Sequence, residues 1–173
     1  MATDYDAIFG DIVFSDDADP AAVQTAISAG HDINCTNNSD SWNALHYVLN
    51  PIMWPPNTDV VRVLLANGCA VNTPDREQWT PLHFAARTGC AATIALLLDS
   101  GADPNSLDRE SVTPFHRYFL RRPIDPSVVQ LFVRYGAIPT DAHRNFATVC
   151  EYPEKDSVLP LLPARIAKRG HST

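Results

Sequence analysis

Histidine is the residue type in this chain with the widest chemical range, because imidazole titrates near neutral pH and ligates metals. The 173 residues include six histidines. Three of them, His46, His83 and His116, end the related pentapeptides WNALH, WTPLH and VTPFH. Equivalent positions of successive repeats lie about one layer apart, so we expect these three side chains not to converge on a metal ion or a reacting group.

The other reactive residue types also lack the spacing that catalysis or metal binding requires. The four cysteines form no CxxC pair, and the chain contains no HExxH helix motif, nucleophile elbow or phosphate-binding glycine loop. The sequence therefore predicts no catalytic residue, no metal site and no cofactor. An enzyme whose site forms only when scattered residues converge is the less favoured alternative. The cysteines are Cys35, Cys69, Cys90 and Cys150.

Charge and hydropathy narrow the class of protein further. The net charge is −7, with eight aspartates and no Lys or Arg in residues 1–40. An acidic chain is a poor candidate for non-specific binding to nucleic acid. No apolar run approaches the ~18 residues of a membrane span, and the N-terminus lacks the basic start of a secretory signal. We therefore expect no nucleic-acid or membrane partner and an intracellular location, cytoplasmic or nuclear.

The elements that would position the histidines are repeated along the chain. GHDIN, GCAVN and GADPN each precede one pentapeptide, and GAIPT follows them at residues 136–140. Gly68 and Gly101 are 33 residues apart, as are His83 and His116. The longer intervals contain PIMWPPN and RRPIDP, whose prolines indicate loops.

This pattern resembles the ankyrin repeat over roughly residues 20–144, and the unit at 78–110 follows the family pattern almost throughout. The resemblance implies an all-α solenoid of stacked helix-turn-helix units with short β-hairpin-like loops. We expect one domain, 1–173. Its units are a degenerate N-terminal capping repeat at 4–40, a repeat with a loop insertion at 41–77, repeats at 78–110 and 111–144, and a C-terminal cap and tail at 145–173.

Local chemistry agrees with that assignment. Thr80 can cap the helix that Pro81 begins, and Asn43 takes the place of this threonine in the first motif. In the family, the motif histidine bonds to the backbone of the turns, and the motif glycine ends the second helix in a left-handed conformation. We therefore expect structural roles for His46, His83, His116, Gly68, Gly101 and Gly136.

The resemblance also implies a function, since ankyrin arrays bind other proteins through the hairpin tips and the concave groove of the first helices. We expect a non-catalytic interaction module that is monomeric. The candidate contacts in the groove form an aromatic and basic stripe, which suits an acidic or phosphorylated segment. The stripe consists of Tyr47, Phe84, Arg87, Arg117 and Arg121. Trp42 and Trp79 on the hairpin arms and Trp54 in the inserted loop are further candidate contacts.

Three alternatives stay open at this point. Trp42 and Trp79 could cover each other as part of the structure, and Trp54 could fold back onto its helical pair. The segment VLPLLPARI could serve as a second docking element, which would make the chain an adaptor that links a bound target to an enzyme complex. Asn72 and Asn105 occupy the hairpin position that is hydroxylated in many members of the family.

Overall fold

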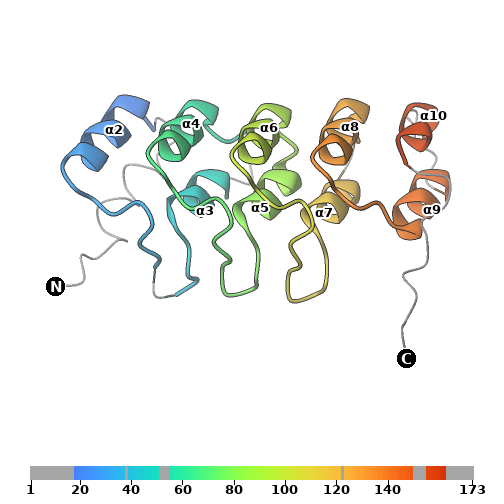
Figure 1. Ribbon diagram of the computed structural model, residues 1–173, viewed down its shortest axis with the longest axis horizontal. Helices are drawn as coiled ribbons and strands as arrows, with labels where there is room; N and C mark the ends of the chain where they lie inside the picture. The colour runs from blue at the N-terminus through green and yellow to red at the C-terminus, as the bar shows by residue number, and fades with distance from the viewer. Residues whose placement is uncertain (1–17, 38, 51–54, 122, 150–154, 163–173) are drawn as a thin grey trace.

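The computed structural model describes residues 18–37, 39–50, 55–121, 123–149 and 155–162. Its helices form two layers that run the length of the molecule (Figure 1). The described residues form helices without any strand, so the all-α fold is confirmed. The inner layer contains α3 (Ala44–Leu49), α5 (Pro81–Thr88), α7 (Pro114–Leu120) and α9 (Asp141–Val149). The outer layer contains α2 (Pro20–Ser28), α4 (Thr58–Ala66), α6 (Ala91–Asp99), α8 (Pro126–Arg134) and α10 (Lys155–Val158), with the 3-10 helix η1 (Leu159–Leu161) after it.

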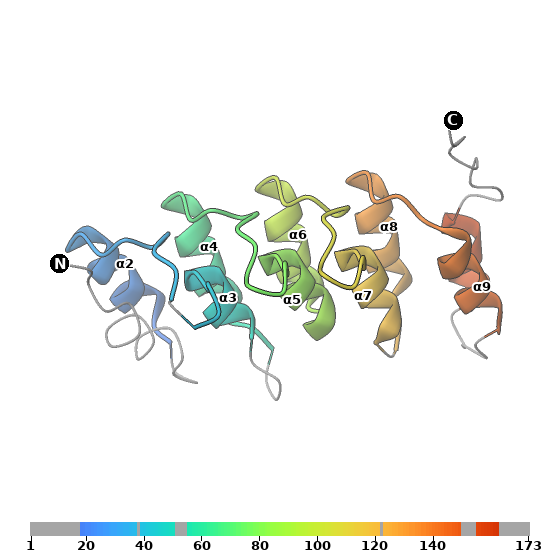
Figure 2. The same cartoon turned by 90° about the horizontal axis from the view of Figure 1, so that it is seen from below.

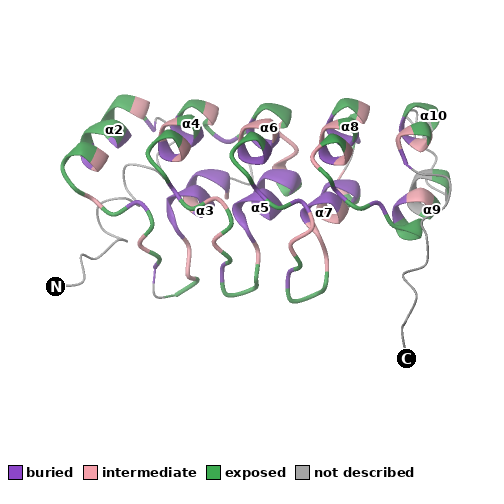
Figure 3. Ribbon diagram, in the orientation of Figure 1, coloured by how far each residue is buried: buried purple, intermediate pink, exposed green. Residues whose placement is uncertain are grey.

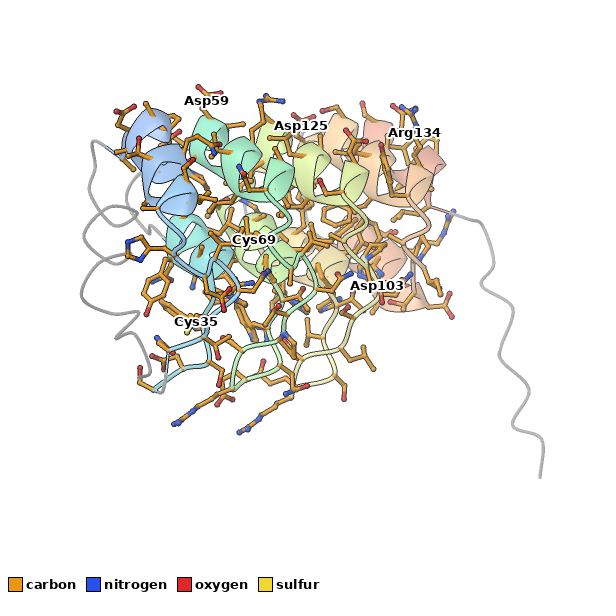
Figure 4. All side chains as sticks on the ribbon, turned by 60° about the vertical axis from the view of Figure 1, so that its left-hand side comes forward. Cys35, Asp59, Cys69, Asp103, Asp125 and Arg134 are labelled. Carbon is orange, nitrogen blue, oxygen red and sulfur yellow. The ribbon has the colours of Figure 1, made fainter. Side chains whose placement is uncertain are left out.

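Short polar side chains define where the helices begin. Asp19, Asn57 and Asp125 precede three outer helices, and each accepts a hydrogen bond from a backbone N–H of the first turn. Proline follows directly after Asp19 and Asp125, where its missing N–H costs nothing. Figure 4 labels Asp59 and Asp125, which both lie at the starts of outer helices.

The core lies between the two layers, and each unit completes the burial of its neighbour. Leu45, Leu82 and Phe115 occupy the same motif position in α3, α5 and α7, and each is at most 1% exposed. Figure 3 shows the buried faces of the inner and outer helices turned toward each other, with exposed residues on the outer surface. No unit could bury these side chains alone, so the array is the folding unit.

Asparagine side chains connect each unit to the next. Asn72 Nδ2 donates to the carbonyl of Gly101, and Asn72 Oδ1 accepts from the amide of Asp103, both at 2.9 Å. Asn34 and Asn105 make the same two bonds to the following units. The glycines that receive these bonds have φ values of +83° to +88°, the left-handed conformation that ends the outer helix. We therefore propose structural roles for Gly68, Gly101 and Gly136 at the ends of the outer helices.

Three hairpin-like loops project from the array below the helices (Figure 1), and they are here named finger 1 (residues 35–42), finger 2 (73–79) and finger 3 (106–112). A backbone bond closes each finger, such as Asp75 N–H to the carbonyl of Trp79 at 2.8 Å. Figure 2 shows the units in the same order along the long axis when viewed from below.

The C-terminal part differs from the expected division of the chain. Helix α9 begins at Asp141, four residues before the expected boundary at 145, because Thr140 and His143 repeat the Thr-x-x-His pattern of the earlier motifs. Gly136 is followed almost directly by this helix, so the described chain forms no fourth finger. Residues 4–17 of the expected N-terminal cap and the tail beyond 162 lie outside the described residues. No described helix is long and apolar enough to cross a bilayer.

Candidate functional site

Two of the motif histidines hold neighbouring units together. The backbone N–H of Thr80 donates to His83 Nδ1 at 3.0 Å, so His83 carries its proton on Nε2, which donates to the carbonyl of Val112 at 3.1 Å. His46 bonds in the same way to the carbonyl of Trp79 at 3.1 Å. Burial lowers the pKa of His46 to about 4 and also lowers the pKa of His83, so both rings are neutral at pH 7. We therefore propose a structural role for both histidines.

His116 departs from this pattern. No backbone carbonyl of a fourth finger is available to it, and its Nδ1 instead lies 3.1 Å from Nε2 of His143. Because Thr140 N–H donates to His143 Nδ1 at 2.8 Å, His143 must donate from Nε2, and His116 accepts. The expectation that His116 bonds to a turn backbone is therefore wrong, although its role is still structural. No group of three or more His, Cys, Asp or Glu side chains in the described part is arranged to hold a metal ion.

Aromatic side chains from neighbouring units gather where the fingers join the inner helices. The Phe84 ring packs in T-shaped geometry against both the Trp42 and the Trp79 ring, with ring centroids 5.5 and 5.4 Å apart. Tyr47 packs edge-on against Trp42 at 5.5 Å. The Trp42 indole N–H also donates to Asp75 of finger 2 at 3.2 Å. The two tryptophans thus contribute to the structure as well as to the surface.

Phe84 lies deeper than the sequence led us to expect. It is only 3% exposed, since Trp42 and Trp79 cover it and the guanidinium of Arg87 lies 5.2 Å from its ring centroid. Phe84 borders the groove, as its motif position predicts, but it offers a partner little accessible surface. Its ring supports the tryptophans that form the surface.

This cluster lines an open pocket on the concave side, with a volume of about 350 Å³. Charged residues of fingers 2 and 3 surround the aromatic floor. The lining residues are Trp42, Asn50, Asp75, Glu77, Trp79, Phe84, Arg87, Arg109, Glu110 and Arg117. An aromatic floor with a few convergent polar groups is the usual character of a recognition site.

Arg117 is already neutralised within the protein. Its guanidinium lies 2.6 Å from Asp108 Oδ2, also contacts Glu110, and stacks on the Trp79 ring at 4.6 Å. Burial alone would lower the pKa of Arg117, but the hydrogen bonds to Asp108 and Glu110 outweigh it and raise the pKa. The Asp108 carboxylate is fully buried, so this pair fixes finger 3 against α7. We therefore do not expect Arg117 to be the main contact for an acidic partner.

Arg87 has a different environment. Its side chain is exposed and donates to the side-chain oxygen of Asn50 at 2.9 Å. It forms no ion pair with any carboxylate that the structure describes, whereas Arg109 lies 3.4 Å from Glu77. Burial of the guanidinium against Trp79 and Phe84 lowers the pKa of Arg87. A carboxylate or phosphate that entered the pocket could therefore form an ion pair with Arg87.

Three predicted residues, Tyr47, Arg121 and Trp54, are not among the described residues that line this pocket. Tyr47 packs behind Trp42. Arg121 lies over Gly89, donates to the carbonyl of Pro123 at 3.3 Å and stacks on Tyr118, so its inclusion in the stripe is wrong. The cause is the loop after α7, which turns the chain away from the groove at Arg121. Trp54 lies outside the described residues.

The sequence did not identify the carboxylates of the pocket as site residues. Asp75, Glu77 and Glu110 line it, and Asp75 accepts from Trp42 and from two backbone amides of finger 2. The recurrence of Asp-Arg-Glu at 75–77 and 108–110 was the available signal, since the same triplet stands at the tips of fingers 2 and 3. Only the fold shows that these triplets adjoin the aromatic cluster.

The comparison with protein families agrees with this architecture. The model for ankyrin repeats, in three copies, matches residues 12–108, and the chain belongs to the ankyrin-repeat family. Members of this family are generally protein–protein interaction modules and are typically non-catalytic. The units formed by α7 to α10 continue the array beyond the matched range. No curated protein matches the chain.

Proposed function

We propose that this protein binds a segment of another protein in the concave pocket between fingers 2 and 3 and the inner helices. The observation that carries the proposal is the unpaired guanidinium of Arg87 beside the Trp42 and Trp79 rings. An acidic or phosphorylated side chain would pair with Arg87, and an apolar neighbour would cover the indole rings. Aromatic residues and arginine are the types that contribute most to binding at protein interfaces.

The charge distribution of the pocket supports a partner with a single acidic side chain rather than an acidic run. Glu77 pairs with Arg109, and Asp108 and Glu110 pair with Arg117, so Arg87 is the cation without an ion pair among the described lining residues. The Asp75 carboxylate also has no cationic partner there, but it accepts from the Trp42 indole and from two backbone amides. A run of carboxylates would meet Glu77 and Glu110, whose side chains are 65% and 71% exposed, and like charges would repel.

The test is affinity capture from native lysate with three baits: wild type, Arg87→Glu and Arg62→Glu. Arg62 is exposed on the outer helix α4, so the second variant has the same charge change on the opposite face. We expect a protein that wild type and Arg62→Glu retain and Arg87→Glu loses. If all three baits retain it equally, the pocket is not the binding site.

Arg87 is a better choice for this test than Trp79. The Trp79 ring packs on His83 and Phe84 of α5 and under the guanidinium of Arg117 of α7, so replacement of Trp79 would disturb two units. Arg87 is exposed, and in the described part of the structure its guanidinium donates to Asn50, so the variant should keep its helicity by circular dichroism.

A further inference from the structure

The stack of fingers has an end at which its hydrogen-bond ladder stops. The amide of Arg76 in finger 2 donates to the carbonyl of Asp40 in finger 1 at 2.9 Å, and the amide of Arg109 in finger 3 donates to the carbonyl of Glu77 at 3.1 Å. The equivalent carbonyl in finger 3 is that of Glu110. No backbone amide of the described residues donates to it, because the segment between α8 and α9 forms no finger (Figure 1).

The contact between fingers 2 and 3 also shows which type of residue connects one finger to the next. Arg109 donates its backbone N–H to the carbonyl of Glu77 and places its guanidinium 3.4 Å from the Glu77 carboxylate. Glu110 is the next acidic residue in this series. Its side chain is 71% exposed and, although it accepts from Arg117, two carboxylate oxygens can accept further bonds.

Exposed apolar side chains lie beside this end of the stack. Leu107 and Ile138 are 59% and 50% exposed, and they are two of the three exposed large apolar residues of the described chain. The Ile138 amide donates to Asn105 Oδ1, and Leu107 follows Asn105 by two residues, so one asparagine anchors both segments. A single exposed leucine is ordinary, but here Leu107 belongs to the same finger as the Glu110 carbonyl, which accepts from no described backbone amide, and Ile138 is bonded to the base of that finger through Asn105.

We propose that the open end of the finger stack, formed by Leu107, Glu110 and Ile138, binds a turn segment of a partner protein that contains an arginine or lysine. The turn donates a backbone N–H to the Glu110 carbonyl and places its cation at the Glu110 carboxylate, as Arg109 does at Glu77. An apolar residue of the turn covers Leu107 and Ile138. Backbone bonds supply affinity and side chains supply specificity in such edge additions.

A second copy of this chain fits the open end less well. In finger 1 of another copy, the residue equivalent to Arg109 is Ser39, and the residue after it is Asp40. Finger 1 would therefore bring a carboxylate toward Glu110 and no cation. Such head-to-tail contacts would also extend into a filament rather than a closed dimer.

The probe for this site is a cyclised peptide with the sequence of residues 73–80, which contains the turn and arginine of finger 2. It is titrated into the full-length protein labelled with ¹⁵N. We expect saturable shifts of the amides of residues 107–112 and Ile138. The Leu107→Asp variant should bind at least about fivefold more weakly, which corresponds to the loss of one modest contact. Thr36→Asp adds the same charge at the equivalent exposed position of finger 1 and should bind like wild type.

A second experiment changes the peptide and not the protein, so its result does not depend on how protein variants fold. A peptide with glutamate in place of its arginine should lose most of its affinity, because the cation then becomes a carboxylate beside Glu110. Shifts that fail to saturate, or that fall on Trp79 and Arg87 instead, would overturn the proposal. The Arg87→Glu protein should bind the peptide normally, which separates this site from the concave pocket.

If the tail of this chain or a second copy covered the open end of the finger stack, experiments on the protein without peptide would detect it. Nuclear Overhauser contacts between the Leu107 methyl groups and residues 163–173 would show that the tail of this chain covers the site. Sedimentation that reveals dimers in the wild type but monomers in Leu107→Asp would show that a second copy covers it. Either result would overturn the proposal of a separate partner.

Discussion

At the scale of single residues, the motif histidine shows how one substitution changes a repeated interaction. In the second repeat the Thr80 hydroxyl lies 3.0 Å from His83 Nδ1 and can donate to it. In the first repeat the equivalent residue is Asn43, and its Oδ1 lies 2.7 Å from His46 Nδ1. That nitrogen already accepts the Asn43 backbone N–H, so two acceptors face each other.

Turning the Asn43 amide over does not remove this conflict. Its Nδ2 would then donate to His46, but its Oδ1 would face the carbonyl of Ala70, to which Nδ2 donates at 3.0 Å. We therefore predict that Asn43→Thr raises the free energy of unfolding by about 1 kcal/mol, the net value of one satisfied buried hydrogen bond. Ala70 keeps the hydroxyl of Thr73 as a donor at 3.3 Å. Urea unfolding followed by circular dichroism measures the change.

The matched control for this prediction is Asn43→Val. Valine has the shape of threonine without the hydroxyl, so it should fail to stabilise the protein. Equal stability of the valine and threonine variants would show that the hydroxyl contributes nothing and that the explanation from His46 is wrong.

Residue-scale predictions from the sequence succeeded where a repeat imposes the environment. The left-handed glycines and the roles of His46 and His83 follow from motif position alone. The covering of Phe84 and the displacement of Arg121 were missed for a common reason, because the sequence indicates the helical face but not what covers it. The two tryptophans bury Phe84, and the loop after α7 draws Arg121 away.

At the scale of elements, the fingers are strained at one equivalent position. Ser41, Gln78 and Ser111 have φ values of 60° to 62°, although none is glycine. This left-handed conformation costs a residue with a Cβ roughly 1–2 kcal/mol. We predict that Gln78→Gly is more stable than Gln78→Ala by about 1 kcal/mol, measured by urea unfolding, because only glycine removes that cost.

Alanine is the proper reference here, since both variants lose the glutamine side chain and differ only in the Cβ. Gln78 is exposed, so no packing is removed in either case. If the alanine variant proved as stable as the glycine variant, the tip of finger 2 would not be strained in solution.

Element boundaries were predictable only as far as the motif remained recognisable. The period and the pair of helices in each unit could be deduced from residues 42 to 136. The start of α9 was missed because Thr140-Asp141-Ala142-His143 lacks the proline and leucine of the earlier motifs and keeps only threonine and histidine. The missing fourth finger was not inferred either, although Gly136 stands too close to Thr140 to allow one. That absence creates the open end of the finger stack.

At the scale of the whole molecule, the array has an unusual junction between its regular part and its C-terminal unit. His143 is 2% exposed and packs against the rings of Phe115 and Phe119 while it donates to His116. Burial and the neighbouring His116 lower the pKa of His143 to about 4, and burial and Arg117 lower the pKa of His116, which Asp108 opposes. The junction therefore requires both rings to be neutral.

Acid should weaken this junction, because the unfolded chain takes up a proton at His143 at a higher pH than the folded chain does. Between the ordinary histidine pKa of 6.5 and the folded value of about 4, the unfolded chain binds more protons than the folded chain. The stabilising contribution of His143 is thus present above pH 6.5 and falls as the pH drops toward 4, by roughly 2 kcal/mol at pH 5. His46, with the same lowered value, adds a similar loss in the first repeat.

We predict that the C-terminal unit opens first, since among the described residues α9 and α10 pack against a neighbouring unit on one side, whereas His46 lies between two described units. Hydrogen exchange at pH 7.5 and pH 5, corrected for intrinsic rates, should show a greater loss of protection in α9 than in α5. The His143→Gln variant cannot titrate at this position, so its unfolding free energy should fall less between these pH values than that of the wild type. An equal fall in both proteins would mean that the imidazole pair does not make the junction sensitive to acid.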